Sequence, residues 1–325
     1  MAEIDLLTNA NLEYIYVSIS KINHKYNDMT TPCFFDENLD DNPLDEILFL
    51  TEKIFPSFDL GLIREVHDDL TAYFSGCCPD VQKNTLPYHN LRHSQMVVLA
   101  AARLFHGLHC NDVSFAISPD TLFKGLLAAY FHDTGMLIQR GDSEHSSMEY
   151  MANHEARSIL FLKKYAARKG YGEDVSRDCA TIIKYTELES DPATFDYHSP
   201  EIQIAGQVIG SADILAQMAD RYYLECLPLL FKEQQSGGIN RHNSALQLME
   251  HTAKFYHNVV LKRLMTTFSN TSRAMQTHFR ERYKIDRNLY IENIDKNIMY
   301  LKRIISKCDS IECLEKHLKR IPPST

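Results

Sequence analysis

The chain has 325 residues, of which 44% are hydrophobic and 24% charged, and its formal net charge is −9. This acidic balance argues against a surface that binds nucleic acid, and no apolar run approaches the ~18 residues of a membrane span. The length allows one large domain or two modest ones, with enough apolar residues for a sizeable core. We therefore expect a globular protein whose partner is neither nucleic acid nor a membrane.

The amino terminus and the cysteines predict the compartment. Glu3 and Asp5 stand in a start that has no apolar run of the secretory type. Eight cysteines are scattered along the chain, and none belongs to a C-x-x-C pair. This spacing matches neither a zinc knuckle nor a disulfide framework, so we expect reduced thiols in a soluble, cytoplasmic protein.

Helical periodicity dominates the sequence, and we find no convincing sheet and no repeat. The expected helices cover residues 60–74, 97–105, 122–131, 148–168, 176–186, 202–231, 245–268 and 289–308. We therefore predict an all-α bundle of many helices around a central site. Residues 1–60 form an N-terminal helical extension whose role stays open, and residues 61–325 form the main domain. The apolar stripe within 290–302 predicts either core or the seam of a homodimer.

Two short segments carry groups that suit a divalent metal. His89 and His93 are four residues apart, so on a helix they would project from one face. His132 and Asp133 are adjacent and offer one nitrogen and one oxygen ligand from a single point. Asp213 lies further on in an apolar run. Such a mixed set suits zinc, iron, manganese or magnesium.

The same groups suit the hydrolysis of a phosphate ester. A divalent ion binds the phosphoryl oxygens and lowers the pKa of a bound water. A carboxylate such as Asp133 can bridge two ions. A histidine that lies near the metal without binding it can protonate the leaving oxygen.

The arrangement resembles the HD-domain superfamily of metal-dependent phosphohydrolases. Tyr88, His89, Asn90 and His93 look like the Tyr-His-Asn-x-x-His signature of the class I cyclic nucleotide phosphodiesterases. The resemblance covers about residues 86 to 220. It implies a 3′,5′-cyclic nucleotide phosphodiesterase with a phosphodiesterase-like helical fold.

The resemblance also implies roles for individual residues. His89 becomes the general acid, and metal-bound hydroxide, which Asp133 helps to hold, becomes the nucleophile. The tighter ion, zinc or iron, is bound by His93, His132, Asp133 and Asp213. A second ion, magnesium or manganese, shares Asp133.

Further residues are implied more weakly. Asn90 is a positioning group, and His154 and Glu155 are candidates for the second ion. A substrate grip is predicted from Tyr88 and from Gln276 with Phe279, which form a Gln-x-x-Phe pattern. Seven other histidines are interpreted as ordinary core or surface groups: His67, His106, His109, His242, His251, His257 and His317.

The chain departs from the phosphodiesterase pattern at two points. Thr134, Gly135 and Met136 stand where the family has a further His and a Pro-Gly, and Met96 replaces an Asp of the first motif. His-Asp-Thr-Gly is closer to the His-Asp-x-Gly of the wider superfamily.

Three functions therefore stay open. The first is a phosphodiesterase that acts on a cyclic nucleotide, with adenine and guanine undecided. The second is a nucleotidase or other phosphomonoesterase of the superfamily. The third is a non-catalytic sensor that binds a metal or a nucleotide.

Overall fold

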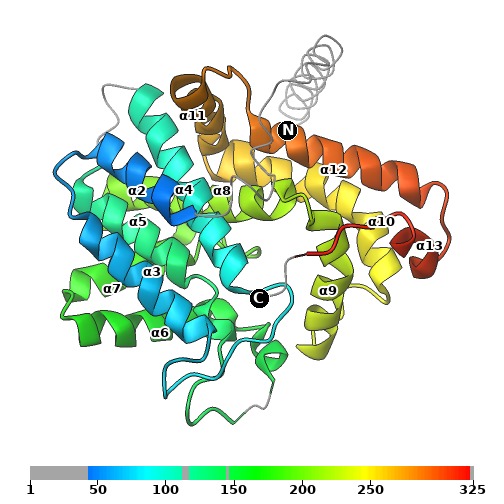
Figure 1. The fold of residues 1–325 in the computed structure, drawn as a ribbon, viewed down its shortest axis with the longest axis horizontal. Coiled ribbons are helices and arrows are strands. Elements are labelled where there is room, and N and C mark those ends of the chain that lie inside the picture. Colours follow the sequence, from blue (N-terminus) through cyan, green and yellow to red (C-terminus); the bar gives the residue numbers. More distant parts are fainter. Residues whose placement is uncertain (1–42, 112–116, 144–145, 323–325) are drawn as a thin grey trace, which may run out of the picture. The chain divides into compact units, whose positions relative to one another are not determined.

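The computed structural model describes residues 43–111, 117–143 and 146–322 (Figure 1). These residues form helices and no β-strand, apart from one isolated bridge between Val81 and Gln139. The prediction of an all-α, multi-helix fold is confirmed. The α-helices are α2 Pro43–Ile54, α3 Leu60–Phe74, α4 Leu91–Asn111, α5 Pro119–Phe131, α6 His154–Lys169, α7 Glu173–Ile183, α8 Pro200–Ala219, α9 Tyr223–Ser236, α10 Ala245–Phe255, α11 Ala274–Tyr283, α12 Leu289–Ile305 and α13 Ile311–Glu315.

Short turns of other helix types join these elements. The 3-10 turns are η1 Thr134–Met136, η2 Ser147–Tyr150, η3 Pro192–Thr194 and η6 Thr271–Arg273, and the π turns are η4 Tyr256–Val260 and η5 Arg263–Thr267. A membrane-spanning length of apolar helix is found nowhere in the described ranges.

The helices α4 and α8 lie at the centre of the bundle. α4 packs against α2, α5, α8 and α11, and α8 packs against α4, α5, α7 and α12. Both helices are therefore buried over most of their length, which fits the apolar run from residue 97 to 102 in α4 and the largely apolar sequence of α8. They give the site that is described below a rigid base.

The helix α5 ends inside this core. Ser118 caps its first turn by accepting a hydrogen bond from the Thr121 amide, and Pro119 occupies the first helical position. Every residue from 121 to 131 is buried. The residue pair that follows, His132 and Asp133, is therefore delivered to the interior.

Three predicted helices differ in detail from the observed ones. The expected helix 202–231 is broken at Asp220, whose ψ of 137° is extended. The Asp220 side chain pairs with Arg92 and accepts a hydrogen bond from the Tyr222 amide, as in an Asx turn. The expected helix 245–268 continues beyond α10 through two π turns, and the expected helix 148–168 begins only at His154.

The carboxy-terminal stripe is core. Ile294, Ile298 and Leu301 of α12 are 0–3% exposed. Of the predicted extension 1–60, residues 1–42 lie outside the described residues. α2 and the start of α3 lie within it, and α2 packs against α4 and α3.

The cysteines require one correction. Cys308 and Cys313 form a disulfide, because the turn after α12 folds α13 back and brings their Cα atoms to 5.4 Å. The expectation of reduced thiols throughout is therefore wrong for this pair. In the described ranges the free cysteines are Cys77, Cys78, Cys110, Cys179 and Cys226.

A buried histidine on α11 makes the fold sensitive to acid. The His278 ring is inaccessible, its Nδ1 lies 3.3 Å from His106 Nδ1, and its Nε2 has no hydrogen-bond partner within the described residues. Burial, with the charge of Arg103, holds the pKa of His278 well below its usual range. Below about pH 6.5 the unfolded chain binds a proton that the folded chain resists, so stability is lost as the pH falls.

Replacing His278 with phenylalanine is expected to remove this contribution. The wild-type protein should lose about 1 kcal/mol more stability than the variant for each pH unit below about 6.5. Urea unfolding of both proteins at neutral pH and one unit below the histidine pKa measures the difference. Equal losses in the two proteins would contradict the role of His278.

Candidate metal centre

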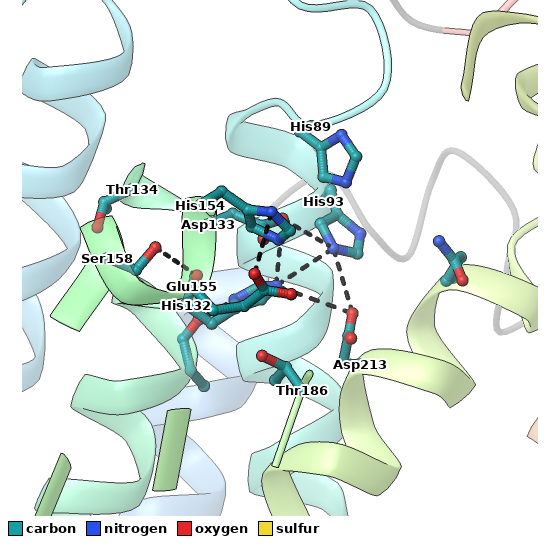
Figure 2. Close-up of polar contacts among 12 residues, drawn as sticks. His89, His93, His132, Asp133, Thr134, His154, Glu155, Ser158, Thr186 and Asp213 are labelled. Carbon is teal, nitrogen blue, oxygen red and sulfur yellow. Dashed lines mark hydrogen bonds and ion pairs between the residues drawn. The ribbon is translucent and has the colours of Figure 1, made fainter. Parts of the chain in front are cut away.

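Two imidazoles and two carboxylates converge on one point (Figure 2). His93 lies on α4, His132 and Asp133 follow α5, and Asp213 lies on α8. His93 Nε2 is 3.3 Å from both Asp133 Oδ2 and Asp213 Oδ1. His132 Nε2 is 3.3 Å from His93 Nε2 and 3.2 Å from Asp133 Oδ2. Its distance to Asp213 Oδ1 is 3.8 Å.

These spacings fit a single divalent ion. Ligand atoms that each lie about 2.0–2.2 Å from a zinc-sized ion are themselves about 3.0–3.5 Å apart. The Oδ2 atom of Asp133 is buried and lacks a hydrogen-bond partner in the described part of the chain, which is costly unless a cation satisfies it. His93, His132 and Asp133 could thus hold an ion together. Asp213 lies close enough to be a fourth ligand.

The cluster is electrostatically prepared for positive charge. Burial opposes protonation of His93, but its close contacts with the carboxylates of Asp133 and Asp213 outweigh this effect and raise the pKa of His93 to about 10. Burial also opposes ionisation of Asp133, yet His132 and His93 hold the pKa of Asp133 well below its usual range. Protons and a metal ion therefore compete for the same atoms, and metal affinity should rise with pH.

The orientation of His93 follows from the start of α4. Asn90 Oδ1 accepts a hydrogen bond from the His93 amide, and Asn90 Nδ2 donates to Pro87 O. Asn90 is therefore the cap that positions the first turn. His89 precedes this helix, so the expectation of two histidines on one helical face is wrong for it. The rings of His89 and His93 are nevertheless 6.2 Å apart.

The orientation of the His132 ring is fixed by a contact with the backbone of α5. Its Nδ1 lies 2.8 Å from Ala129 O, which directs Nε2 toward the cluster. The Ser158 hydroxyl of α6 donates to His132 O at 2.5 Å and accepts from the Gly135 amide at 2.8 Å. A single serine thus ties the turn after the His-Asp pair to α6.

Gly135 allows α6 to approach this turn. A Cβ atom at Gly135 would lie 1.9 Å from His154 O and 2.7 Å from Ser158 N, both of which are backbone atoms. Gly135→Ala is therefore expected to cost about 1–3 kcal/mol of stability and to weaken metal binding. Urea unfolding and metal titration measure the two effects. Gly61→Ala, whose Cβ would meet only the Asp59 side chain, is the control.

The predicted candidates for a second ion lie beside the first cluster. His154 and Glu155 begin α6. His154 Nδ1 is 2.7 Å from Met151 O, and its Nε2 is 3.6 Å from Asp133 Oδ1. Glu155 Oε2 is 3.3 Å from His154 Nδ1. The second oxygen of Asp133 thus faces a further imidazole, which suits a bridging role for this carboxylate.

A buried glutamate pairs with His89. Glu233, on α9, has no exposed surface, and its Oε2 lies 2.6 Å from His89 Nδ1. The Tyr88 amide donates to Glu233 Oε1 at 2.8 Å. Burial opposes protonation of His89, but Glu233 and Asp133 more than offset it, so the pKa of His89 is raised. Glu233 was not among the predicted residues, because no local motif marks a partner 144 positions away.

A cavity of about 300 Å³ opens in front of the cluster. Its lining contains the four converging groups, His89, His154 and Glu155. The rest of the lining is largely apolar and comes from α8, α9, α10 and the turn after α10, as at Ile214, Met218, Tyr223, Leu227, Leu230, Leu248, Phe255 and Val260. Such a volume and lining suit a small organic ligand.

The residues that were predicted to bind the substrate do not line this cavity. Gln276 hydrogen-bonds to Asp286 at the surface, and Phe279 is fully buried on α11 beneath Arg103. Tyr88 is buried beside His93 and pairs through its hydroxyl with Gln217. None of the three predicted grip residues lines the cavity as the described residues define it.

Arg263 supports another part of the cavity wall and was not predicted. Its guanidinium donates to three backbone carbonyls in the segment after α7, those of Tyr185, Glu187 and Leu188. Arg263 stands at the start of the π turn η5, and such turns are frequent at functional sites. Thr186 within the segment also lines the cavity.

Comparison with known sequences gives one match. A family model described as Npun_R2479-like matches residues 77–294, which is more than half of the chain. The matched part contains the four converging groups, His89 and Glu233. No curated protein sequence matches the chain.

Proposed function

The chain belongs to the Npun_R2479-like family, and from the site within the matched part we propose that it is a divalent-metal-dependent phosphohydrolase. The observation that carries this proposal is the juxtaposition of two groups. One is the mixed imidazole and carboxylate cluster, and the other is the His89–Glu233 pair in the same cavity.

The cluster accounts for the binding of an ion. His93, His132, Asp133 and Asp213 would hold it, and a bound ion would supply Lewis acidity for phosphoryl oxygens and water. The two imidazoles and two carboxylates suit zinc or iron, and the Asp133 side facing His154 and Glu155 suits magnesium or manganese.

The His89–Glu233 pair accounts for the proton that a leaving oxygen needs. The carboxylate of Glu233 engages Nδ1 of His89, so Nε2 is the atom that can donate into the cavity. The Glu233 carboxylate raises the pKa of His89 and so favours the protonated ring. A histidine whose charged form is favoured beside a metal site, without belonging to it, suits a general acid.

Within this class, the resemblance of residues 88–93 to the class I signature supports a 3′,5′-cyclic nucleotide as substrate. The positions of Gln276 and Phe279 favour the second candidate, a nucleotidase or phosphomonoesterase, because the base grip that the first candidate calls for is missing from the cavity of the described residues. The intact cluster argues against a sensor without catalysis. A cytoplasmic location and a homodimer stay predictions from the sequence.

The test is metal analysis combined with a substrate panel. We expect the purified protein to contain a divalent metal and to hydrolyse cyclic AMP, cyclic GMP, a nucleoside 5′-monophosphate or bis(p-nitrophenyl) phosphate. A chelator should abolish the activity, and added zinc or manganese should restore it. Bound metal without hydrolysis of any of these compounds would instead assign the protein to the sensors.

A further inference from the structure

The lining of the cavity also carries a group of cationic and imidazole side chains that are not members of the metal cluster. Arg241 and His242 lie in the loop before α10, and His251 lies on α10. All three line the cavity. Both of these histidines were expected from the sequence to be ordinary core or surface groups, and the proposed mechanism uses none of the three.

The two histidines face each other at close range. Their ring centroids are 5.4 Å apart. The Nδ1 atom of His242 is buried and has no hydrogen-bond partner among the described residues. A buried polar atom without a partner in a cavity wall is the kind of group that a ligand satisfies.

Arg241 can be released for a ligand at little cost. Its guanidinium pairs with Glu189, and the side chains of Arg241 and Glu189 are 50% and 80% exposed. An ion pair this exposed contributes little to stability, so an anion in the cavity can replace the Glu189 carboxylate. Burial, His251 and Arg241 together lower the pKa of His242, and a bound anion would reverse the last two effects.

The carboxylates of the cavity lining belong to one group of residues. Those in the described lining, Asp133, Glu155 and Asp213, are the acidic members of the metal cluster and its neighbour. Arg241, His242 and His251 are not among the groups that converge in that cluster. Apolar residues of α9 and α10, such as Leu230 and Leu248, line the same cavity.

We propose that Arg241, His242 and His251 form a subsite for a second phosphate group of the substrate. The inference rests on the proposed phosphohydrolase function and narrows its substrate to a phosphate ester that carries another phosphate, as a nucleoside bisphosphate does. One phosphate is bound at the metal cluster and the other is bound by the guanidinium and the two imidazoles. An apolar or aromatic portion of the substrate contacts α9 and α10.

The test compares the binding of two ligands by calorimetry. The zinc-loaded full chain with His89→Ala, which slows turnover, is titrated with adenosine 3′,5′-bisphosphate and with adenosine 5′-monophosphate. The bisphosphate should bind at least about tenfold more tightly, since a charge-assisted contact is worth about ten- to a hundredfold in affinity. In Arg241→Gln, and in a double variant with His242→Gln and His251→Gln, this ratio should fall toward one.

Arg177→Gln is the matched control. Arg177 is also 50% exposed and also pairs with a single carboxylate, that of Asp178, but it lies outside the cavity lining. It should keep the full ratio. No preference for the bisphosphate, or a preference that Arg241→Gln leaves intact, would overturn the subsite. If the double histidine variant kept the full affinity ratio while Arg241→Gln lost it, the role assigned to His242 and His251 would be overturned.

The outcome is independent of the test of the proposed function. The calorimetric ratio reports binding and not turnover, so a protein that binds metal but hydrolyses nothing could still show the subsite. Conversely, a hydrolase that binds both ligands equally would retain the proposed function and lose the inference.

Discussion

His89→Ala is expected to lower kcat by about 10²–10⁴-fold while the metal content of the protein stays unchanged. The reason is geometric. His89 lines the cavity and pairs with Glu233, but it is not one of the four groups of the metal cluster. Steady-state kinetics and elemental analysis of the same preparation provide the two readings. Loss of the metal together with activity, or survival of activity, would make the assignment wrong.

A companion variant separates chemistry from folding. Alanine leaves the buried Glu233 carboxylate with only the Tyr88 amide as a hydrogen-bond donor among the described contacts. His89→Asn can still donate to Glu233, but it cannot act as a general acid. We expect His89→Asn to be as inactive as His89→Ala and more stable in thermal unfolding.

The pH profile tests the role of Glu233. The proposed mechanism requires protonated His89, so activity should decline as the pH rises through the raised pKa of His89. Glu233→Gln keeps a hydrogen bond but removes the charge, which lowers that pKa. The alkaline limb of the kcat profile should therefore move to lower pH in the variant. If the alkaline limb did not move, a group other than His89 would be responsible for it.

The second large effect is expected at Asp133. Asp133→Asn removes the charge that faces both His93 and His132, and leaves an amide where the cluster calls for a ligand oxygen anion. We expect metal affinity to fall by at least about 100-fold and activity to be lost with it. Metal titration against a chelator of known affinity measures the metal affinity, and the substrate panel measures the activity.

A matched aspartate provides the control for this experiment. Asp220 directly follows α8, and its side chain is 15% exposed against 4% for Asp133. Asp220 pairs with Arg92 and takes no part in the cluster. Asp220→Asn should retain the metal. If Asp133→Asn also retained it, the four-group site would be refuted.

The sequence predicted the converging groups because their signals are local. An apolar helix that ends at His132 and Asp133 must place this pair in the interior, and an aspartate in the apolar run of α8 must point at something that compensates its charge. The all-α fold followed from periodicity for the same reason. These inferences needed no knowledge of which helices become neighbours.

The rest of the site depends on distant contacts. Glu233 meets His89 only because α9 departs from α8 at Asp220, and nothing near Glu233 in the sequence marks that bend. Gln276 has the expected spacing from Phe279, but packing of α11 against α4 directs both away from the cavity. The cavity role of His251 likewise depends on where α10 lies, since a histidine on an amphipathic helix is usually an ordinary surface group.

The break at Asp220 divides the site between two parts of the chain. All four groups of the cluster precede it, whereas Glu233, whose carboxylate raises the pKa of His89, follows it on α9. A tilt of α9 would withdraw that carboxylate and leave the cluster untouched. Under the proposed function, metal occupancy and catalytic competence would then be separate properties of the molecule. A preparation that is fully occupied could still be inactive, so its active fraction would have to be measured by turnover and not by metal analysis.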